Sequence, residues 1–233
     1  MNTRYYQKFA VAVIIGNLRR SGKENLIPQE ILNSYKTGLT SQQAQTLFSI
    51  ASENNVKLYY FKRSDRPLPR VHKTLSFLKG IYFESLIDIG SGRGAFLLPF
   101  LEEFSNVSVT AVDILNKRVE MLTDISNGGV DNLTVVNHDI QTAPLNMQAD
   151  VVTLLEVLEH IPDVKTAIRN AVLMAKKYVI VTVPSKEDDN PEHLRLLTKE
   201  VLTNYFNMAG VTKLTFDGVN GHLFLIAKVQ NEL

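Results

Sequence analysis

The sequence predicts an α/β fold in which a doubly wound, mostly parallel, seven-stranded sheet follows an N-terminal helical extension. Three observations lead to this prediction. From about Phe83 onward short β-branched runs alternate with helical patterns, a glycine-rich turn follows the first run, and the last two runs are close enough to form a hairpin. We therefore divide the chain into a basic helical extension, residues 1–80, which is a candidate substrate-recognition region, and a ligand-binding domain, residues 81–233.

The first eighty residues carry the apolar spacing of helices. Apolar residues recur at helical spacing from Phe9 and again from Ile27. Thr40 followed by Gln43 forms the pattern of a capping box, which predicts a third helix beginning there. A fourth helix is expected over residues 71–78 and leads into the second domain.

The remainder of the chain alternates between strand and helix patterns. Strands are expected at residues 85–89, 107–112, 133–137, 151–155, 178–183, 213–216 and 223–229, and helices at residues 94–104, 117–126, 164–175 and 199–208. Thr198 suits the N-cap of the last helix. Because only Asp217 to His222 separates the final two strands, one of them must run antiparallel to the rest.

Composition excludes several classes of site. No cysteine occurs among the 233 residues, which excludes disulfides, thiolate metal sites and a cysteine nucleophile, and favours a reducing, cytoplasmic location. The apolar run from Phe9 to Ile15 leads into Arg19 and Arg20 and lacks a small-residue cleavage site. We therefore interpret this run as an amphipathic helix rather than a signal peptide, and expect no membrane partner.

A strand, a glycine-rich turn and a helix start run through Leu86-Ile-Asp-Ile-Gly-Ser-Gly-Arg-Gly94. Glycines in such a turn let the backbone bend tightly and approach a ligand, so we expect a nucleotide-like ligand at Gly90, Gly92 and Gly94. Gly90, Gly92 and Ala95 also satisfy the G-x-G-x-x-G/A dinucleotide fingerprint. An NAD(P)-linked oxidoreductase is therefore an alternative, although no recognisable Ser-Tyr-Lys group accompanies the turn.

Acidic residues mark three successive strands. Asp88 lies inside the first strand, Asp113 ends the second, where a carboxylate can accept hydrogen bonds from both ribose hydroxyls, and Asp139 ends the third. Taken singly, Asp113 and Asp139 could equally be turn or capping residues. Together with the Leu-x-Asp-x-Gly-x-Gly-x-Gly turn, the three acids resemble the motifs of class I S-adenosylmethionine-dependent methyltransferases, over roughly residues 84–229.

The resemblance implies a Rossmann-like methyltransferase fold and S-adenosylmethionine as the cofactor. In that family the residue at the position of Asp139 hydrogen-bonds the adenine amino group, and Ile114 and Ile140 would pack against the ring. The implied cofactor site comprises Asp88, Gly90, Gly92, Gly94, Asp113, Ile114, Asp139 and Ile140.

A second group of polar residues, Glu-Val-Leu-Glu-His, begins at Glu156 after the fourth strand. Glu156, Glu159 and His160 are spaced i, i+3 and i+4, so a helical turn would place them on one face. Two carboxylates and an imidazole suit a divalent cation. His193 follows the fifth strand at the same rim of the sheet and is a fourth candidate ligand.

The Glu-x-x-Glu-His group with a later His resembles two branches of the family, the metal-dependent small-RNA 3′-terminal 2′-O-methyltransferases and the O-methyltransferases of ubiquinone biosynthesis. The RNA branch implies Mg²⁺ or Mn²⁺ on four ligands, Glu156, Glu159, His160 and His193. That branch also has a Pro-Pro-Leu and Gln-Arg element, for which this chain offers only Pro67-Leu-Pro-Arg70. Without metal, His160 would line the acceptor pocket and act as general base, so Glu156 and His160 are the candidate catalytic residues in either case.

The acceptor is indicated only by charge. Residues 1–80 hold 13 Lys and Arg against four acidic residues, a net +9, whereas the rest holds 12 against 20, a net −8. Basic and aromatic residues interleave before the second domain, at Lys57, Tyr59, Tyr60, Phe61, Lys62, Arg63, Arg66, Arg70 and Lys73. Such a segment favours an RNA acceptor, or else it neutralises the acidic domain and leaves a small-molecule hydroxyl as the acceptor. The oligomeric state is not indicated.

Overall fold

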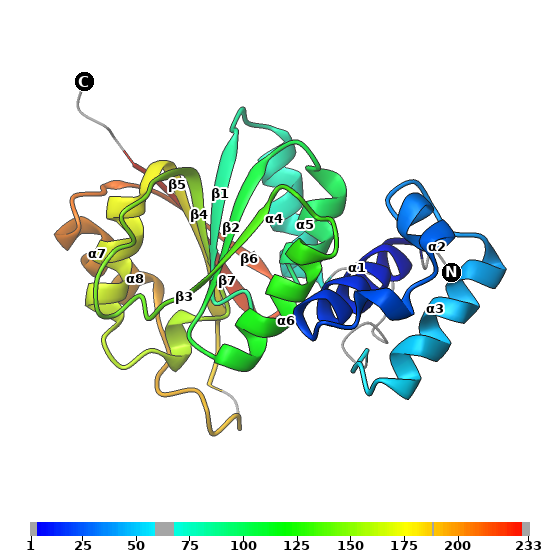
Figure 1. The fold of residues 1–233 in the computed structure, drawn as a ribbon. Helices are drawn as coiled ribbons and strands as arrows, with labels where there is room; N and C mark the ends of the chain where they lie inside the picture. The colour runs from blue at the N-terminus through cyan, green and yellow to red at the C-terminus, as the bar shows by residue number, and fades with distance from the viewer. Residues whose placement is uncertain (1–3, 59–67, 188, 230–233) are drawn as a thin grey trace.

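The computed structural model describes residues 4–58, 68–187 and 189–229, and within them a seven-stranded sheet with helices on both faces (Figure 1). The strands are β1 (Ser85–Ile89), β2 (Ser108–Asp113), β3 (Leu133–Asn137), β4 (Ala149–Leu155), β5 (Ala175–Pro184), β6 (Lys213–Val219) and β7 (His222–Lys228). Their order is β3-β2-β1-β4-β5-β7-β6. Strands β1 to β5 are parallel and β7 is antiparallel to both of its neighbours, so the predicted fold class is confirmed.

The strand order reverses between β1 and β4, which lie side by side although they are far apart in the sequence. In an open α/β sheet of this kind, ligands bind outside the carboxyl ends of the strands at the reversal. Residues that follow β1, β2, β3 and β4 therefore converge on one edge of the sheet.

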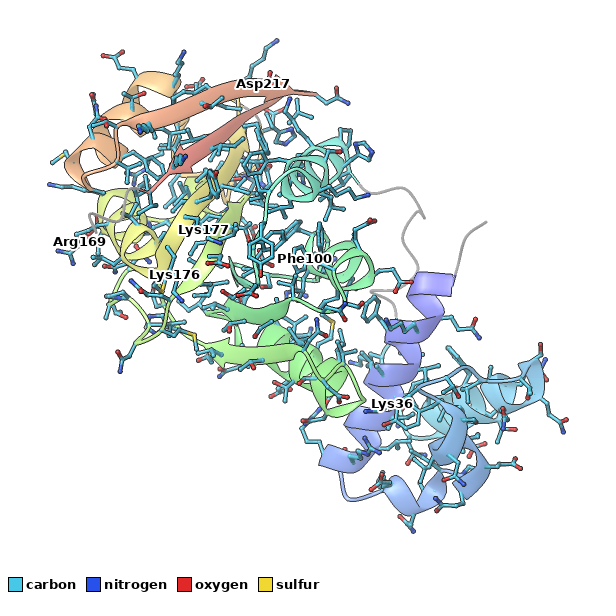
Figure 2. The ribbon with its side chains drawn as sticks, turned by 90° about the horizontal axis from the view of Figure 1, so that it is seen from above. Lys36, Phe100, Arg169, Lys176, Lys177 and Asp217 are labelled. Atoms are coloured by element: carbon cyan, nitrogen blue, oxygen red, sulfur yellow. The ribbon has the colours of Figure 1, made fainter. Side chains whose placement is uncertain are left out.

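Helices cover both faces of the sheet. On one face lie α4 (Pro69–Lys79), α5 (Leu97–Glu103) and α6 (Asn116–Asn127), and on the other lie α7 (Val164–Met174) and α8 (Lys199–Met208) (Figure 1). Side chains alternate between the two cores along each strand, so Leu86 packs on the α5 side and its neighbour Ile87 on the α7 side. Phe100 of α5 is fully buried within the first core (Figure 2).

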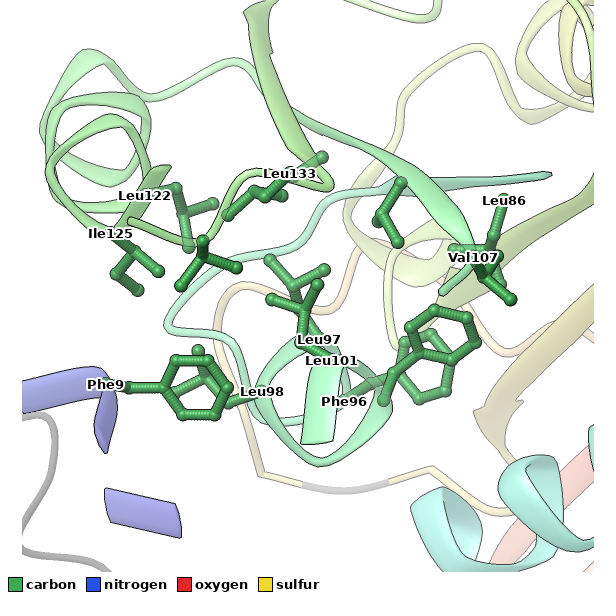
Figure 3. Packing of buried hydrophobic residues seen from close by; sticks show 14 of the residues in the cluster. Phe9, Leu86, Phe96, Leu97, Leu98, Leu101, Val107, Leu122, Ile125 and Leu133 are labelled. Carbon is green, nitrogen blue, oxygen red and sulfur yellow. The ribbon is translucent and has the colours of Figure 1, made fainter. Parts of the chain in front are cut away.

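The N-terminal helices α1 (Arg4–Arg20), α2 (Gln29–Ser34) and α3 (Ser41–Glu53), with the short 3₁₀ turn η1 (Glu24–Leu26), form a smaller cluster beside α6 (Figure 1). The predicted capping box of Thr40 and Gln43 is present at the start of α3. Helix α1 contributes Phe9 to the main core, where it lies beside Leu98 (Figure 3), and Ile14 to the core of the N-terminal cluster.

Helix α1 approaches α6 closely at two glycines. A Cβ atom on Gly16 would lie 1.9 Å from the backbone oxygen of Asp124, and one on Gly128 would lie 1.8 Å from that of Ala12. At the same contact the Asp124 carboxylate, which is almost fully buried, accepts hydrogen bonds from Arg20 Nε and Nη2 at 2.7 and 2.9 Å. At this contact the N-terminal helices are therefore joined to the sheet domain by the close packing of α1 on α6 and by an ion pair whose acid is buried.

Two expectations about element bounds need correction. The helix expected over residues 94–104 begins only at Leu97, because Gly94 has φ +76°, which a right-handed helix does not accept. Strand β5 is longer than expected and begins at Ala175, directly after α7. Lys62, Arg63, Arg66 and the aromatic residues Tyr59, Tyr60 and Phe61 lie outside the described residues. Among the described helices, none combines the length and apolar character needed to cross a membrane.

Candidate functional site

The glycine turn after β1 is shaped by backbone conformations that favour glycine. Gly90, Gly92 and Gly94 have φ values of +68°, +56° and +76°. The turn is held to the next strand by Gly90 N, which donates to Val112 O at 2.8 Å. A Cβ on Gly90 would lie 2.5 Å from Cγ2 of Val157, so the turn also touches the segment after β4.

Asp113 at the end of β2 is buried and faces this turn. One carboxylate oxygen accepts a hydrogen bond from Gly92 N at 2.8 Å, and the other accepts one from Leu115 N at 2.9 Å. Asp113 therefore makes the hydrogen bonds of a turn residue, which is one of the two roles that the sequence allowed for it. Each oxygen still has an acceptor position left over, so the same carboxylate can serve a ligand hydroxyl as well.

A cavity of about 590 Å³ opens at the carboxyl ends of β1, β2, β3 and β4. Its lining includes Gly90, Gly92, Asp113, Ile114, Asp139, Ile140, Glu156 and His160. Ile114 exposes 57% of its surface and gives the cavity an apolar wall that suits a planar ring. Asp139 accepts a hydrogen bond from Gln141 N at 2.9 Å and stays at the rim of the same cavity.

Two of the expected cofactor residues lie outside this lining. Among the described residues that line the cavity are Gly90 and Gly92, but neither Asp88 nor Gly94. Asp88 is 3% exposed and accepts a hydrogen bond from Thr153 Oγ1 at 2.7 Å. Asp88 therefore lies behind the turn, and Gly94 is part of the turn but does not line the cavity.

The helical turn expected over residues 156–160 is present only in part. Glu156 has φ +60°, a left-handed conformation, and the 3₁₀ turn η3 spans only Leu158–His160. The expectation that Glu156, Glu159 and His160 share one helical face is therefore wrong. Positive φ in a non-glycine residue costs roughly 1–2 kcal/mol and is found preferentially at functional sites.

The reversed backbone at Glu156 directs its carboxylate toward three other elements. Thr182 Oγ1 of β5 donates to Glu156 Oε1 at 2.8 Å. His222 Nε2, at the start of β7, lies 2.9 Å from Oε2, and Arg70 Nε of α4 lies 3.8 Å from Oε1. Glu156 thus connects the cavity to the side chains of Arg70 and His222, which sequence reasoning did not place in the site.

A separate cluster contains the other three candidate ligands. Glu159, His160 and His193 bring one ligand atom each to within 4.8 Å of one another, and Glu159 is buried. His160 Nδ1 lies 2.9 Å from the backbone oxygen of Glu192, which can only accept, so Nδ1 is the donor in this contact. Leu194 N donates to Glu159 O at 2.9 Å and ties the loop after β5 to this turn.

Several cavity residues were missed by sequence reasoning. They are Ile89, Leu115, Arg118, His138, Gln141, Val157, Ile161 and Glu192. Gln141 and Leu115 lie two residues after the predicted acids, so their position at the strand ends was a usable signal. Glu192 directly precedes His193, the candidate ligand in the loop after β5, so the prediction for that loop was a usable signal as well.

Much of the basic charge in residues 1–80 is paired with acids of the sheet domain. Six of its 13 Lys and Arg residues form ion pairs there, namely Lys8–Glu102, Arg20–Asp124, Lys36–Asp131, Arg70–Glu156, Lys73–Asp217 and Lys79–Glu103. Lys36 lies at the junction between the N-terminal helices and the sheet domain (Figure 2). Neutralisation within the chain therefore accounts for a large part of the charge asymmetry.

Comparison with known proteins identifies a methyltransferase domain in this chain. A family model described as a methyltransferase domain matches residues 60–213. A ubiquinone biosynthesis O-methyltransferase from Rickettsia canadensis is 29% identical over 102 residues, which cover 44% of this chain and 42% of that protein. A ribosomal RNA small subunit methyltransferase G from Limosilactobacillus fermentum is 30% identical over 137 residues, covering 56% of this chain and 54% of that protein. The chain thus spans about half the length of these curated relatives.

Solved structures share the fold at low sequence identity. An O-methyltransferase family protein from Burkholderia thailandensis superposes with a TM-score of 0.57 at 14% identity, over 81% of this chain and 60% of that one. The magnesium protoporphyrin IX methyltransferase from Synechocystis PCC 6803 with bound S-adenosylhomocysteine gives a TM-score of 0.56 at 14% identity, over 83% of this chain and 89% of that one.

Proposed function

This chain belongs to the family of proteins that carry the methyltransferase domain, and on that premise we propose that it transfers the methyl group of S-adenosylmethionine to an oxygen atom of a small-molecule acceptor. One observation carries the proposal. The glycine turn, Asp113 and Asp139 surround a single cavity at the point where the strand order reverses. The family match also decides against the NAD(P)-linked oxidoreductase.

The described residues fit the cofactor. Gly90 and Gly92 leave room for its methionine part at the turn, and Asp113 offers both carboxylate oxygens to the ribose hydroxyls. Ile114 and Ile140 provide apolar walls for the adenine ring, and Asp139 is placed to accept a hydrogen bond from the adenine amino group. When bound, S-adenosylmethionine supplies a sulfonium methyl group that needs no further activation.

The protein then has to orient the acceptor and receive its proton. His160 lines the cavity, and because its Nδ1 donates to the Glu192 carbonyl, the lone pair of the neutral ring would lie on Nε2. An imidazole in this state can accept the hydroxyl proton of the acceptor as the new C–O bond forms. We therefore assign the general base to His160 in the absence of a metal.

A divalent cation is a second candidate contribution. Glu159, His160 and His193 form a donor set of one carboxylate and two imidazoles, which suits Mn²⁺ better than Mg²⁺ because Mg²⁺ prefers oxygen ligands. A cation held there would lower the pKa of an acceptor hydroxyl. Glu156 is left out of this set, since Arg70, Thr182 and His222 occupy its carboxylate.

The charge distribution supports a small molecule over RNA. Six basic residues of the extension are used in pairs with the sheet domain, which leaves less positive charge for phosphates. An RNA acceptor would bind through the remaining basic residues and would show affinity that falls steeply with salt.

The decisive experiment is label transfer from methyl-tritiated S-adenosylmethionine into fractionated RNA, protein and small molecules, with and without EDTA. We expect label in the small-molecule fraction as a methyl ether or ester. Label confined to RNA or protein would contradict the acceptor class, and failure to bind S-adenosylhomocysteine in calorimetry would contradict the cofactor. Loss of transfer in EDTA, restored by Mn²⁺, would assign the cation.

A further inference from the structure

We propose that Gln141 is a positioning residue of the cofactor site, which holds the Asp139 carboxylate for the 6-amino group of the adenine base. This inference rests on the proposed methyl transfer and adds a residue through which the site selects adenine over a 6-oxo base. Gln141 lies in the turn that follows β3, is half-buried and lines the cavity together with Asp139. Its side chain makes hydrogen bonds to two different segments of the chain.

The hydrogen bonds to the Asp139 carboxylate both reach the same oxygen atom. Gln141 N donates to Asp139 Oδ1 at 2.9 Å, and Gln141 Nε2 donates to the same oxygen at 3.3 Å. Within the described part of the chain, Asp139 Oδ2 accepts no hydrogen bond. Because Asp139 lines the cavity, Oδ2 is the oxygen that remains for a donor on a ligand.

The Gln141 amide is oriented by a contact at the start of α7. Asp163, the N-cap of that helix, donates from its backbone N to Gln141 Oε1 at 3.0 Å. The amide oxygen therefore faces this N–H, and the NH₂ group faces Asp139. An exchanged amide would place its NH₂ group against a donor and its oxygen against a carboxylate, and would satisfy neither contact. The backbone of Asp163 thus makes Gln141 a donor toward Asp139.

The backbone of this turn is held without the Gln141 side chain. Thr142 N and Thr142 Oγ1 both donate to the Asp139 backbone oxygen, at 3.1 and 2.8 Å. The neighbouring wall residue Ile140 is held separately, because Nδ2 of Asn170, a fully buried residue of α7, donates to Ile140 O at 2.7 Å. The Gln141 side chain can therefore be replaced while these hydrogen bonds remain, which separates its effect on the carboxylate from the folding of the turn.

A carboxylate oxygen at this place distinguishes two purine bases. Adenine presents a 6-amino group, which donates, whereas hypoxanthine presents a 6-oxo group, which can only accept. Asp139 Oδ2 accepts from the amino group but meets the oxo group as one acceptor against another, which lowers the affinity for the second base. Because Gln141 holds Oδ1, the carboxylate offers Oδ2 to the base. Gln141 therefore sharpens the selection through Asp139 rather than by contact with the ligand.

The test compares S-adenosylhomocysteine with S-inosylhomocysteine, in which a 6-oxo group replaces the 6-amino group, and measures both affinities by calorimetry. We expect the unaltered protein to prefer the adenosyl ligand at least about tenfold, and Gln141→Met to reduce this preference about three- to tenfold. An undiminished preference in Gln141→Met, or no preference in the unaltered protein, would overturn the inference. Failure of the unaltered protein to bind S-adenosylhomocysteine would instead contradict the proposed methyl transfer.

Two variants separate positioning from a purely structural contact. Gln141→Glu keeps an acceptor for Asp163 N but loses the donor to Asp139, so it should lose the preference as Gln141→Met does. A Gln141→Glu variant with the full preference would reduce Gln141 to a structural contact with α7. Gln148→Met is the matched control, because the Gln148 amide donates to Leu173 O of the same helix at 3.0 Å but does not line the cavity. It should keep the full preference, and a loss there would overturn the assignment.

A double-mutant cycle tests whether Gln141 acts through Asp139. In Asp139→Ala the acceptor for the 6-amino group is gone, so the preference should already be small. Adding Gln141→Met to this variant should change the ratio of the two affinities no further, since the carboxylate that Gln141 positions is absent. A second loss of the same size as in Gln141→Met alone would show that Gln141 acts independently and would overturn the inference.

Discussion

Asp88 and Thr153 face each other across the paired strands β1 and β4, and the Thr153 hydroxyl donates to the Asp88 carboxylate at 2.7 Å. Burial of Asp88 raises its pKa from 3.8 to about 6, and the hydrogen bond from Thr153 opposes part of that rise. The protein therefore holds a carboxylate directly beneath the glycine turn in surroundings that favour its neutral form.

This pair makes stability depend on pH. Because the pKa of Asp88 is higher in the folded chain, the folded chain binds more protons between pH 3.8 and about 6 and loses stability as pH rises through that window. Above this pH window the lost stability amounts to about 3 kcal/mol. Asp88→Asn removes the ionisable group. The unfolding free energy of this variant should therefore rise relative to that of the unaltered protein as pH rises from 4 to 7. Urea unfolding at several pH values measures the difference, and a constant difference would contradict the prediction.

Replacement of Asp113 should weaken cofactor binding without unfolding the protein. In Asp113→Ala the ribose hydroxyls lose their acceptor, which costs about 1–3 kcal/mol, or roughly ten- to hundredfold in affinity. Asp113→Asn should lose less, because one amide oxygen remains as an acceptor. Calorimetry with S-adenosylhomocysteine checks the order of the two variants, and unchanged affinity in Asp113→Ala would remove Asp113 from the cofactor site.

The glycine turn allows a comparison between two alanine substitutions. Gly90→Ala meets Val157 at 2.5 Å and also a positive φ, whereas Gly92→Ala meets only the positive φ, since its nearest atom lies at 3.7 Å. We expect Gly92→Ala to cost about 1–2 kcal/mol and Gly90→Ala distinctly more. Val157→Ala should recover part of the loss in Gly90→Ala. Thermal unfolding and cofactor affinity report on both, and equal losses would contradict the contact with Val157.

His160→Ala should abolish methyl transfer while S-adenosylhomocysteine binding stays within about twofold, because the proposal gives His160 the acceptor's proton and none of the contacts to the cofactor. His193→Ala separates the two proposed roles. If His160 acts as base, His193→Ala retains most activity. If a cation is used, His193→Ala loses activity as EDTA does, and Mn²⁺ binding measured by calorimetry disappears with it.

Gly16→Ala should separate the N-terminal helices from the sheet domain. The added methyl group would lie 1.9 Å from the Asp124 backbone oxygen, so α1 must move away from α6 at a cost of roughly 1–3 kcal/mol. Gly218→Ala is the control, because no atom lies within 4 Å of its added Cβ. A melting temperature unchanged in Gly16→Ala would show that the contact is looser than described.

Local patterns were sufficient to predict the fold. Strands, the glycine turn and the acids at Asp113 and Asp139 follow from residues adjacent in sequence, and the sheet order and family match confirm the fold class and the resemblance. The burial of Asp88 could also be expected, because it lies between Ile87 and Ile89 inside the predicted strand, and it is buried with β1. The individual site residues and the division at residue 80 remain predictions.

The surroundings of Glu156 could not be predicted from the sequence. Its partners Arg70 and His222 come from α4 and β7, and nothing in the spacing of Glu156 to His160 indicates a left-handed backbone at its first residue. Tertiary contacts decide that conformation. A pattern of i, i+3 and i+4 predicts a shared face only when the segment is helical, and here only its last three residues form a turn.

Helix α1 gives the chain a shared unfolding transition. Because Phe9 belongs to one core and Ile14 to the other, unfolding of the helix exposes buried side chains in both cores. The basic and acidic parts of the chain should therefore melt cooperatively, with amide protons of α1 exchanging at rates close to those of β1. A ligand that binds at the carboxyl ends of the strands should then slow hydrogen exchange in α1 as well, although that helix does not touch it.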